Sequence, residues 1–348
     1  MLTKTPTELQ HAVQRIVEAV GTPPDNAAIV AQLLVGSHLA GHDSHGIQHL
    51  PRYVQEVRAG EIVAQARPQV MRETASTALV GGNWAWGHVT ADFVTRLGIR
   101  KARESGVALI SAVEVNHIGR LGEYVDQAAR EGVVGVLVSG GNAEELATAA
   151  PYGGRKALLA PNPIAIGFPV AEEPPLIVDF ATTRVAGGKV ALAKAKGESV
   201  PLGWIIDSAG EPSTHPDDYY NGGALLPFGE HKGFGIMVAI EILGRILAGA
   251  DAFADTPHGG TYFRHVGITL IAIDSGVFSS VGDFGRRTAE LAARGRAVPP
   301  ADGFERVLMP GDFEHANTLA RRTAGIAIPE ATWEEMCQTA ASLGVVID

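Results

Sequence analysis

The sequence predicts an α/β fold with a helical lobe that both ends of the chain build together. Between residues 78 and 274, short runs rich in β-branched residues alternate with amphipathic stretches of helical period. Helical periodicity dominates before and after this part. The Gly-x-Gly-x-x-Gly fingerprint is missing, so a Rossmann sheet is not expected. We predict an α/β lobe over residues 73–284 and a discontinuous helical lobe over 1–72 with 285–348.

The composition is typical of a soluble globular protein with an acidic balance. Of 348 residues, 46% are apolar, and 28 Lys and Arg against 38 Asp and Glu give a net charge of −10. A spread-out acidic charge argues against nucleic acid and anionic membranes as partners. No run of ~18 apolar residues occurs. Cys337 is the single cysteine, so no internal disulfide can form, and we predict a cytoplasmic protein.

Helices open the chain. The order Thr5-Pro6-Thr7-Glu8 is a capping-box start for a first helix, and Asp25 is a candidate cap for a second. The second helix is expected to continue into a stretch with three histidines, and Pro51 is expected to end it.

His42, His45 and His49 are spaced i, i+3 and i+7, so a continuous helix would present them on one face. That face suits a metal site, a proton-transfer site, an anion site or a buried polar cluster. Zinc sites usually include cysteine or carboxylate at defined spacing as well, so no metal is expected. Ser44 could pair with His45 as a nucleophile, but no Gly-x-Ser-x-Gly elbow presents it.

The middle of the chain predicts strands separated by helices. Residues 107–113 and 133–140 read as strands with a helix between them, so we expect a parallel crossover and a shared edge for their carboxyl ends. Gly106 should end the preceding helix. Further expected elements are strands within 78–83, 175–183, 203–207 and 266–274, a helix over about 233–248, and mainly helix from 284 onward.

Dispersed turns offer candidate ligand sites. "NHIGRLG" (116–122) places His117 and two glycines at a helix start, where free N–H groups can receive a phosphate; the alternative is a structural turn. Lys232 and Gly233 form a similar anion seat, unless the lysine is merely solvated. Asp179 can orient a ribose or a histidine, or simply cap the turn that follows it. Trp84 and Trp86 are expected in the core.

Taken together, seven ordered stretches between residues 43 and 312 resemble one known family. They are "DSHGIQHLPRY", "NHIGRLGEY", "PNPIAIGFP", "DFATTRVAGGK", "LGWIIDSAGEPSTHP", "GALLPFGEHKGFGI" and "LMPGD". The chain resembles the malate/L-lactate dehydrogenase family of the second type, which includes ureidoglycolate and sulfolactate dehydrogenases and a diketogulonate reductase. The resemblance implies a mixed non-Rossmann sheet with flanking helices, NAD or NADP as cofactor, a small-molecule substrate and a homodimer.

The resemblance also implies roles for individual residues. His45 with its neighbour Ser44, or His117, would carry the proton. Cofactor contacts would come from Gly119, Arg120, Leu121, Gly122, Asn142, Asp179, Phe180, Ala181, Thr182, Lys232, Gly233, Pro310 and Gly311. NADP needs cations for its 2′-phosphate, and "PGDFEH" offers acids, which favours NAD.

Three positions depart from the family pattern. His49 stands where the family usually has an arginine that binds the substrate carboxylate, so His49 and Arg52 are the candidate substrate-binding residues. Pro161 replaces a common threonine, and Lys189 replaces the aspartate of imine-reducing members.

We therefore predict an oxidoreductase that transfers a hydride between a nicotinamide cofactor and a 2-hydroxy acid or related polar alcohol. A cyclic imine reductase and a cofactor-binding scaffold without turnover are the alternatives. If His49 anchors the acid group, activity on 2-keto acids should fall as pH rises through about 6–8.

Overall fold

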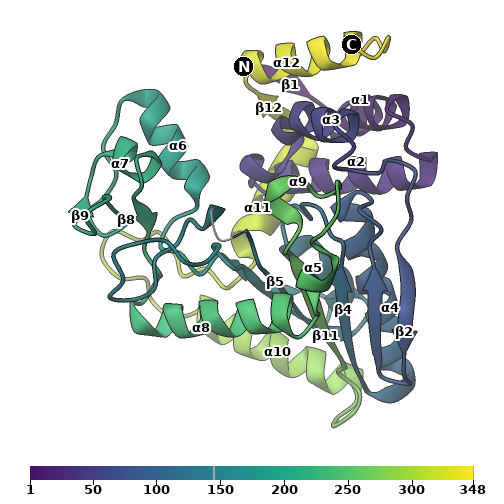
Figure 1. Cartoon of the computed structure of the whole chain (residues 1–348). Coiled ribbons are helices and arrows are strands. Elements are labelled where there is room, and N and C mark those ends of the chain that lie inside the picture. Colours follow the sequence, from purple (N-terminus) through teal and green to yellow (C-terminus); the bar gives the residue numbers. More distant parts are fainter. Residues whose placement is uncertain (144–145, 348) are drawn as a thin grey trace.

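A seven-stranded mixed sheet forms the centre of the computed structural model, which describes residues 1–143 and 146–347 (Figure 1). The strand order is β2-β3-β4-β11-β5-β6-β7. β3 and β4 pair in parallel, and the other described neighbours pair antiparallel. This confirms the mixed α/β class. The strands are β2 (Gln69–Glu73), β3 (Thr77–Gly81), β4 (Val107–Val113), β5 (Val133–Gly140), β6 (Ile164–Phe168), β7 (Leu176–Phe180) and β11 (Gly267–Asp274).

The predicted pairing of β4 with β5 is wrong, because β11 lies between them. Leu270 of β11 faces Ile110 of β4 and Leu137 of β5, and all three side chains are fully buried. An almost wholly apolar strand such as β11 is most stable in the middle of a sheet, where both faces are covered. β4 and β5 still run in the same direction, so their carboxyl ends share one edge, as expected.

Helices cover both faces of the sheet. α4 (Gly87–Ser105) and α5 (Gly122–Arg130) pack on one face, and Gly106 ends α4 with φ 81°, as predicted. Gly98 of α4 allows close approach, since a Cβ there would lie 2.6 Å from Leu270. α8 (His231–Glu241) continues into the π-helical turn η4 (Ile242–Ile246), and together they span the predicted 233–248 helix and pack on β5.

Both chain ends contribute to one helical lobe, where Figure 1 places the N- and C-termini. The lobe joins α1 (Pro6–Ala19), α2 (Pro24–Leu39) and α3 (Leu50–Arg58) with α12 (Glu330–Ala341) around one buried apolar cluster that includes Trp86. β1 (Leu2–Lys4) pairs antiparallel with β12 (Ile326–Ile328). The predicted Thr5–Glu8 capping box is present.

Asp25 does not cap α2. Pro23 occupies the N-cap position, and the Asp25 carboxylate accepts two hydrogen bonds from Arg67, each 2.7 Å long. Pro24 at the first helical position starts α2 in its place, because its fixed φ suits a helix and its missing N–H is not needed there.

The remaining C-terminal helices take different places. α10 (Val281–Arg296) packs Gly285 against Ala171, beside the sheet, whereas α11 (Asp312–Ala324) packs on α2. The predicted lobe boundaries at 72/73 and 284/285 stay a prediction.

A small arm projects beside the sheet (left in Figure 1) and has its own core around Val190, Ile205 and Leu225. It contains α6 (Gly187–Lys196), β8 (Ile205–Ile206), β9 (Pro212–Ser213), α7 (Pro216–Tyr220) and β10 (Ala224–Leu225). The strand expected over 203–207 is thus only two residues long. The short elements η5 (Ala250–Phe253) and α9 (Gly260–Phe263) precede β11. No helix in the described part is long and apolar enough to cross a membrane.

Candidate active site

The histidine-rich stretch is not one helix. α2 ends at Leu39, and two 3₁₀ turns, η1 (Asp43–His45) and η2 (Ile47–His49), lead into α3. Gly41, with φ 86°, allows the chain to leave the helix. Pro51 lies in the first turn of α3 and so starts a helix, contrary to the prediction that it ends one.

The expected shared face of three histidines is therefore wrong. His42 turns away, and its Nε2 lies 2.8 Å from Glu314 Oε1. His45 and His49 turn toward His117, with ring centroids 6.4 Å and 5.4 Å from that ring. Two of the three histidines thus join a cluster that sequence spacing could not reveal.

His117 is the centre of this cluster. It follows β4 at the sheet edge, and its Nδ1 lies 2.5 Å from the hydroxyl oxygen of Tyr53, which comes from α3. Phe263 packs on its ring at 5.9 Å. Tyr53 is 1% exposed and was not predicted as a site residue, although its position four residues after His49 is a signal that could have found it.

His88 is a second residue that sequence reasoning missed. Its buried ring meets Tyr53 edge to face at 5.7 Å, and neither ring nitrogen has a hydrogen-bond partner within the described residues. Gly119 lies against it: a Cβ there would be 2.8 Å from His88 Nε2, and φ is 72°. Both the space and the backbone conformation therefore require glycine at 119. No sequence motif marks His88.

Burial keeps these histidines neutral. Burial, followed by the charges of His42 and Arg120, lowers the pKa of His45 to about 4. Burial and then the charge of Arg52 lower the pKa of His49 to about 4. Burial also places the pKa of His117 well below its ordinary value. The cluster is thus a set of neutral rings near pH 7, and the expected titration of His49 between pH 6 and 8 is corrected to lower pH.

Ser44 and Arg52 border the cluster. Ser44 Oγ lies 3.1 Å from His45 Nδ1, at the exposed side of that turn. Arg52 stacks over the Tyr53 ring at 5.2 Å and pairs with Glu56 at 3.2 Å, with 47% of its side chain exposed. Arg52 is therefore a cation that faces the neutral histidines from one side.

The start of α5 is not an open phosphate seat. The Gly122 N–H donates to Asp179 Oδ2 at 2.9 Å, and Arg120 Nε lies 3.2 Å from the same oxygen. Arg120 also pairs with Glu123 at 3.0 Å, while Leu121 is the buried N-cap. Asp179 thus caps a distant helix and not the turn that follows it. Burial raises the pKa of this carboxyl, although Arg120 opposes the shift.

The turn after β7 runs alongside the entry to α8. The backbone oxygen of Thr182, which follows Ala181, accepts from the Phe228 N–H at 3.0 Å, and the Phe180 and Phe228 rings are 5.3 Å apart. Lys232, in the first turn of α8, is exposed. The next residue, Gly233, is required because a Cβ there would overlap the Phe228 carbonyl oxygen. The structure therefore brings the predicted 179–182 and 232–233 segments to neighbouring strands of chain.

Pro310 and Gly311 lie at the opposite end of β7 from this turn. The Ile177 N–H donates to the Pro310 oxygen at 3.1 Å, and Gly311, with φ 95°, is the N-cap of α11. The helix that follows reaches the histidine turn through Glu314.

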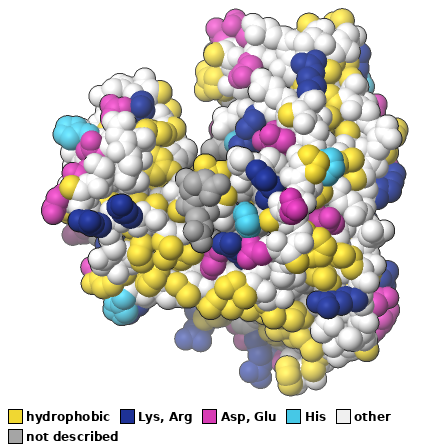
Figure 2. Space-filling view, in the orientation of Figure 1, with side chains coloured by type: hydrophobic (Ala, Val, Ile, Leu, Met, Phe, Trp, Pro, Cys, Tyr) yellow, Lys and Arg dark blue, Asp and Glu magenta, His cyan; other side chains and the backbone are white. Residues whose placement is uncertain are grey.

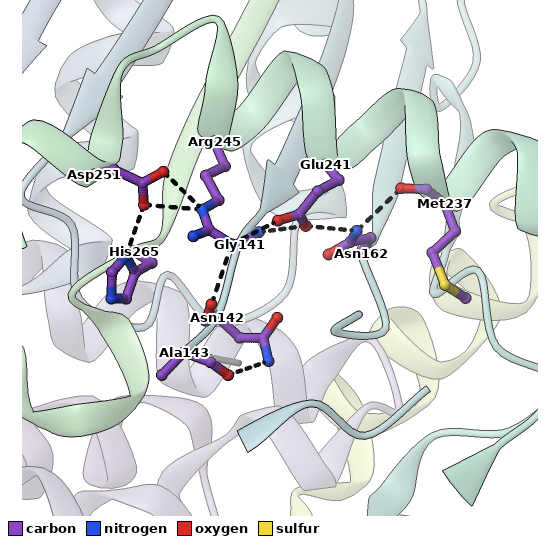
Figure 3. A network of polar contacts seen from close by, with 9 residues as sticks. All are labelled: Gly141, Asn142, Ala143, Asn162, Met237, Glu241, Arg245, Asp251 and His265. Carbon is purple, nitrogen blue, oxygen red and sulfur yellow. Dashed lines mark hydrogen bonds and ion pairs between the residues drawn. The ribbon is translucent and has the colours of Figure 1, made fainter. Parts of the chain in front are cut away.

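A buried carboxylate organises the edge where β5 ends and β6 begins (Figure 3). Glu241 Oε2 accepts from the Gly141 N–H and from Asn162 Nδ2, both at 3.0 Å. Arg245 pairs with Glu241 at 3.3 Å and donates to the Asn142 backbone oxygen at 3.4 Å. Asn162 adopts φ 39°, and its Oδ1 is buried without a partner among the described residues. Sequence reasoning missed Glu241 as a site residue.

These residues share one edge of the sheet, formed by the ends of β4, β5 and β7 and the starts of β6 and β11. Figure 2 shows a notch between the arm and the main body, with charged and histidine side chains at its base. Within the described residues, no group of three or more His, Cys, Asp and Glu could hold a metal ion. That no metal is needed stays a prediction.

Comparison with known proteins identifies the family. The model described as malate/L-lactate dehydrogenase matches residues 5–337. The chain belongs to the malate/L-lactate dehydrogenase family. The resemblance predicted from sequence is thereby confirmed, and the chain is an oxidoreductase that acts on CH–OH groups.

Relatives and solved structures agree with this membership. L-sulfolactate dehydrogenase of Methanothermobacter thermautotrophicus is 35% identical over 347 residues, covering 99% of this chain and 98% of the relative. Sulfolactate dehydrogenase from Methanocaldococcus jannaschii superposes with a TM-score of 0.90 at 30% identity, covering 99% of this chain and 98% of that one. Δ1-piperideine-2-carboxylate reductase from Pseudomonas syringae superposes with a TM-score of 0.86 at 29% identity, covering 98% and 100%. This dehydrogenase family points to a nicotinamide cofactor.

Proposed function

We propose that this family member interconverts a small 2-hydroxy acid and its 2-keto acid with NAD or NADP. The observation that carries the proposal is the convergence of His45, His49, His117 and Tyr53 at the sheet edge, from three separate segments. A neutral, buried histidine beside a cluster of polar groups is suited to proton transfer to and from a hydroxyl.

The residues along the edge fit a dinucleotide. Lys232 offers an exposed cation for a pyrophosphate, and Phe180, 38% exposed, offers an aromatic surface. The unsatisfied Asn162 Oδ1 suits an amide donor. We propose the thirteen cofactor residues named above as the contacts, and NAD over NADP because Asp312 and Glu314 make the segment after Gly311 acidic. When bound, the nicotinamide gives or takes the hydride.

The chain's own residues would move the proton. Tyr53 engages Nδ1 of His117, so Nε2 is the atom left to exchange a proton with the substrate oxygen. In the oxidation, Nε2 takes the hydroxyl proton, and in the reduction it returns a proton to the carbonyl oxygen. His45, oriented by Ser44, is the second candidate for this role.

Arg52 is the proposed anchor of the substrate carboxylate. A neutral His49 can offer only one hydrogen bond, whereas a guanidinium offers a charge and two parallel donors. Arg52 faces the cluster but is already paired with Glu56. The carboxylate is therefore held weakly, and we expect malate and lactate to be poor substrates.

Cyclic imine reduction is the second candidate, favoured by the structural similarity to Δ1-piperideine-2-carboxylate reductase. Lys189 argues against it, because this residue is an exposed lysine on α6 of the arm. Cofactor binding without turnover is the remaining alternative.

We also propose a cytoplasmic homodimer. Large apolar side chains are exposed on η4 and the nearby edge of the sheet, with Ile246 63%, Leu247 53% and Met71 45% accessible. Figure 2 shows hydrophobic side chains gathered over the lower surface near α8. Exposed patches of this kind usually mark an interface. Light scattering at micromolar concentration tests the dimer, and a monomer contradicts it.

The deciding experiment is a panel of 2-keto acids and cyclic imines assayed with NADH and NADPH at the nicotinamide absorbance band. Turnover of a keto acid supports the proposal, and turnover of imines alone supports the second candidate. Calorimetry with each dinucleotide separates the scaffold alternative: binding without turnover supports the scaffold. Undetectable binding of both dinucleotides contradicts every version.

A further inference from the structure

One face of α11 contacts the backbone turn that precedes His45. Glu314, Asn317 and Arg321 are spaced i, i+3 and i+7, so they lie on the same side of the helix. They meet three successive residues: Asn317 lies against Gly41, Glu314 pairs with His42, and Arg321 pairs with Asp43. These contacts join positions more than 270 residues apart in the chain.

Arg321 makes the densest set of these contacts. Its Nη1 lies 2.5 Å from both the His38 backbone oxygen and Asp43 Oδ1, and its Nη2 lies 3.4 Å from Asp43 Oδ2. His38 Nδ1 approaches the same carboxylate at 3.0 Å. The guanidinium therefore joins the last turn of α2 to the 3₁₀ turn that carries Ser44 and His45.

The turn has little intrinsic stability to hold this shape. A single three-residue 3₁₀ turn makes few internal hydrogen bonds, and here glycines stand on both sides of it. Gly46 packs directly on the buried His38 ring. The position of His45 is thus set by contacts with other elements and not by its own segment.

We propose that Arg321 and Glu314 are positioning residues, through which α11 holds His45 in line with His117. The inference rests on the proposed function, because it assigns a purpose to the placement of His45 in that site. A displacement of about 1 Å at a proton-transfer group can cost about 10²-fold in rate.

The distance along α11 separates this role from cofactor binding. Arg321 follows Gly311 by ten residues, which is roughly 15 Å at 1.5 Å per residue. Loss of the Arg321 contacts should therefore lower kcat while leaving dinucleotide affinity near that of the wild type.

Arg321→Met, which keeps much of the length and removes the charge, is the test variant, and Arg322→Met is the matched control on the exposed neighbour. We expect kcat to fall about 10- to 100-fold in Arg321→Met, with dinucleotide affinity changed less than about twofold, and the control to remain unchanged. Arg321→Lys should recover part of the rate. Asp43→Asn should produce a similar loss, and the double variant should lose no more than either single change.

Hydrogen exchange gives a readout that does not need turnover. Amides of residues 42–46 should exchange faster in Arg321→Met than in the wild type or in Arg322→Met. Unchanged exchange and unchanged kcat in a folded Arg321→Met would overturn the inference while the proposed function stands. If the wild type turns over no substrate, the proposed function fails, and the exchange data still decide whether Arg321 holds the turn.

Discussion

His117 and His45 both reach the sheet edge as neutral rings, and burial is the main cause in each case. The two differ in their partners, since His117 is engaged by a buried tyrosine and His45 by a more exposed serine. At the scale of the residue, the partner on Nδ1 determines the proton that Nε2 can exchange.

Replacing the proton-transfer residue should have a large effect on rate. We expect His117→Ala to lower kcat by about 10²–10⁴-fold, the usual contribution of a positioned acid or base, and His45→Ala to lower it by a similar factor if that ring acts. Steady-state kinetics on the best keto acid measures both. Near-normal rates in both variants would contradict the assignment of proton transfer to this cluster.

The neutrality of His49 gives a pH prediction. A protonated His49 would bind a carboxylate more tightly, and its charge is lost as pH rises through its lowered pKa of about 4. KM for 2-keto acids should therefore be flat between about pH 6 and 8, because the ring has already lost its proton. A several-fold rise of KM across that window, measured at constant ionic strength, would show that His49 titrates there.

A permanent charge at this position should change the affinity. We expect His49→Arg to raise kcat/KM for 2-keto acids about 10-fold or more, since a charge-assisted hydrogen bond contributes about 1.5–3 kcal/mol. Gln48→Arg is the matched control, because it adds the same charge at the exposed neighbouring residue. An equal gain in both variants would mean that general electrostatic attraction, and not the His49 position, is responsible.

At the scale of elements, the site depends on how separate segments are tied together at the sheet edge. Glu241 of α8 connects the end of β5 to the start of β6. Thr182, after β7, adds a 2.6 Å hydrogen bond to the Pro161 oxygen. Three strand ends are therefore held in one arrangement by buried polar contacts.

Removal of the Glu241 carboxylate should destabilise this arrangement. Glu241→Leu leaves the Gly141 N–H and the Asn162 amide without their acceptor, and it leaves Arg245 without one partner. We expect the free energy of unfolding to fall by about 3–5 kcal/mol, as when one partner of a buried pair is removed. Urea unfolding measures it. Glu290→Leu, at an exposed pair with Arg286, is the control and should change stability by less than about 1 kcal/mol.

At the scale of the whole molecule, contacts between the chain ends join the lobe to the site. β1 pairs with β12, and α11 reaches the turn of His45 through the Arg321–Asp43 pair. Burial alone would raise the pKa of Asp43, but hydrogen bonds from His38 and Arg321 outweigh it and lower the pKa to about 2.

This lowered pKa predicts acid sensitivity. The Asp43 contacts add stability that is fully present above the unfolded pKa of about 3.9 and is lost as pH falls toward 2. Asp43→Asn should therefore lower stability near neutral pH and flatten the decline of Tm between about pH 4 and 2. Differential scanning calorimetry over that range checks the slope, and an unchanged acid limb would contradict the role of the pair.

Metal removal is a further test of the whole molecule. Chelator treatment should leave turnover and Tm unchanged. One tightly bound zinc ion per chain by mass spectrometry would contradict this expectation.

Local chemistry made much of the fold predictable from sequence. The Thr5–Glu8 capping box starts α1, Gly106 ends α4, and the apolar runs over 107–113, 133–140 and 266–274 form strands. Each depends on side chains within a few residues of one another, so the pattern in the chain is enough. The ordered motifs likewise predicted the family.

Long-range contacts were decided only by the tertiary structure. β11 enters between β4 and β5 from more than 100 residues away, and Tyr53, His88 and Glu241 join the site from separate segments. The histidine spacing predicted one helical face, but the glycines at 41 and 46 break the helix, so His42 meets Glu314 while His45 and His49 meet His117. Sequence determined which groups this protein has for its chemistry. Packing decided which of them meet and which are neutral, because burial and partner choice depend on residues distant in the chain.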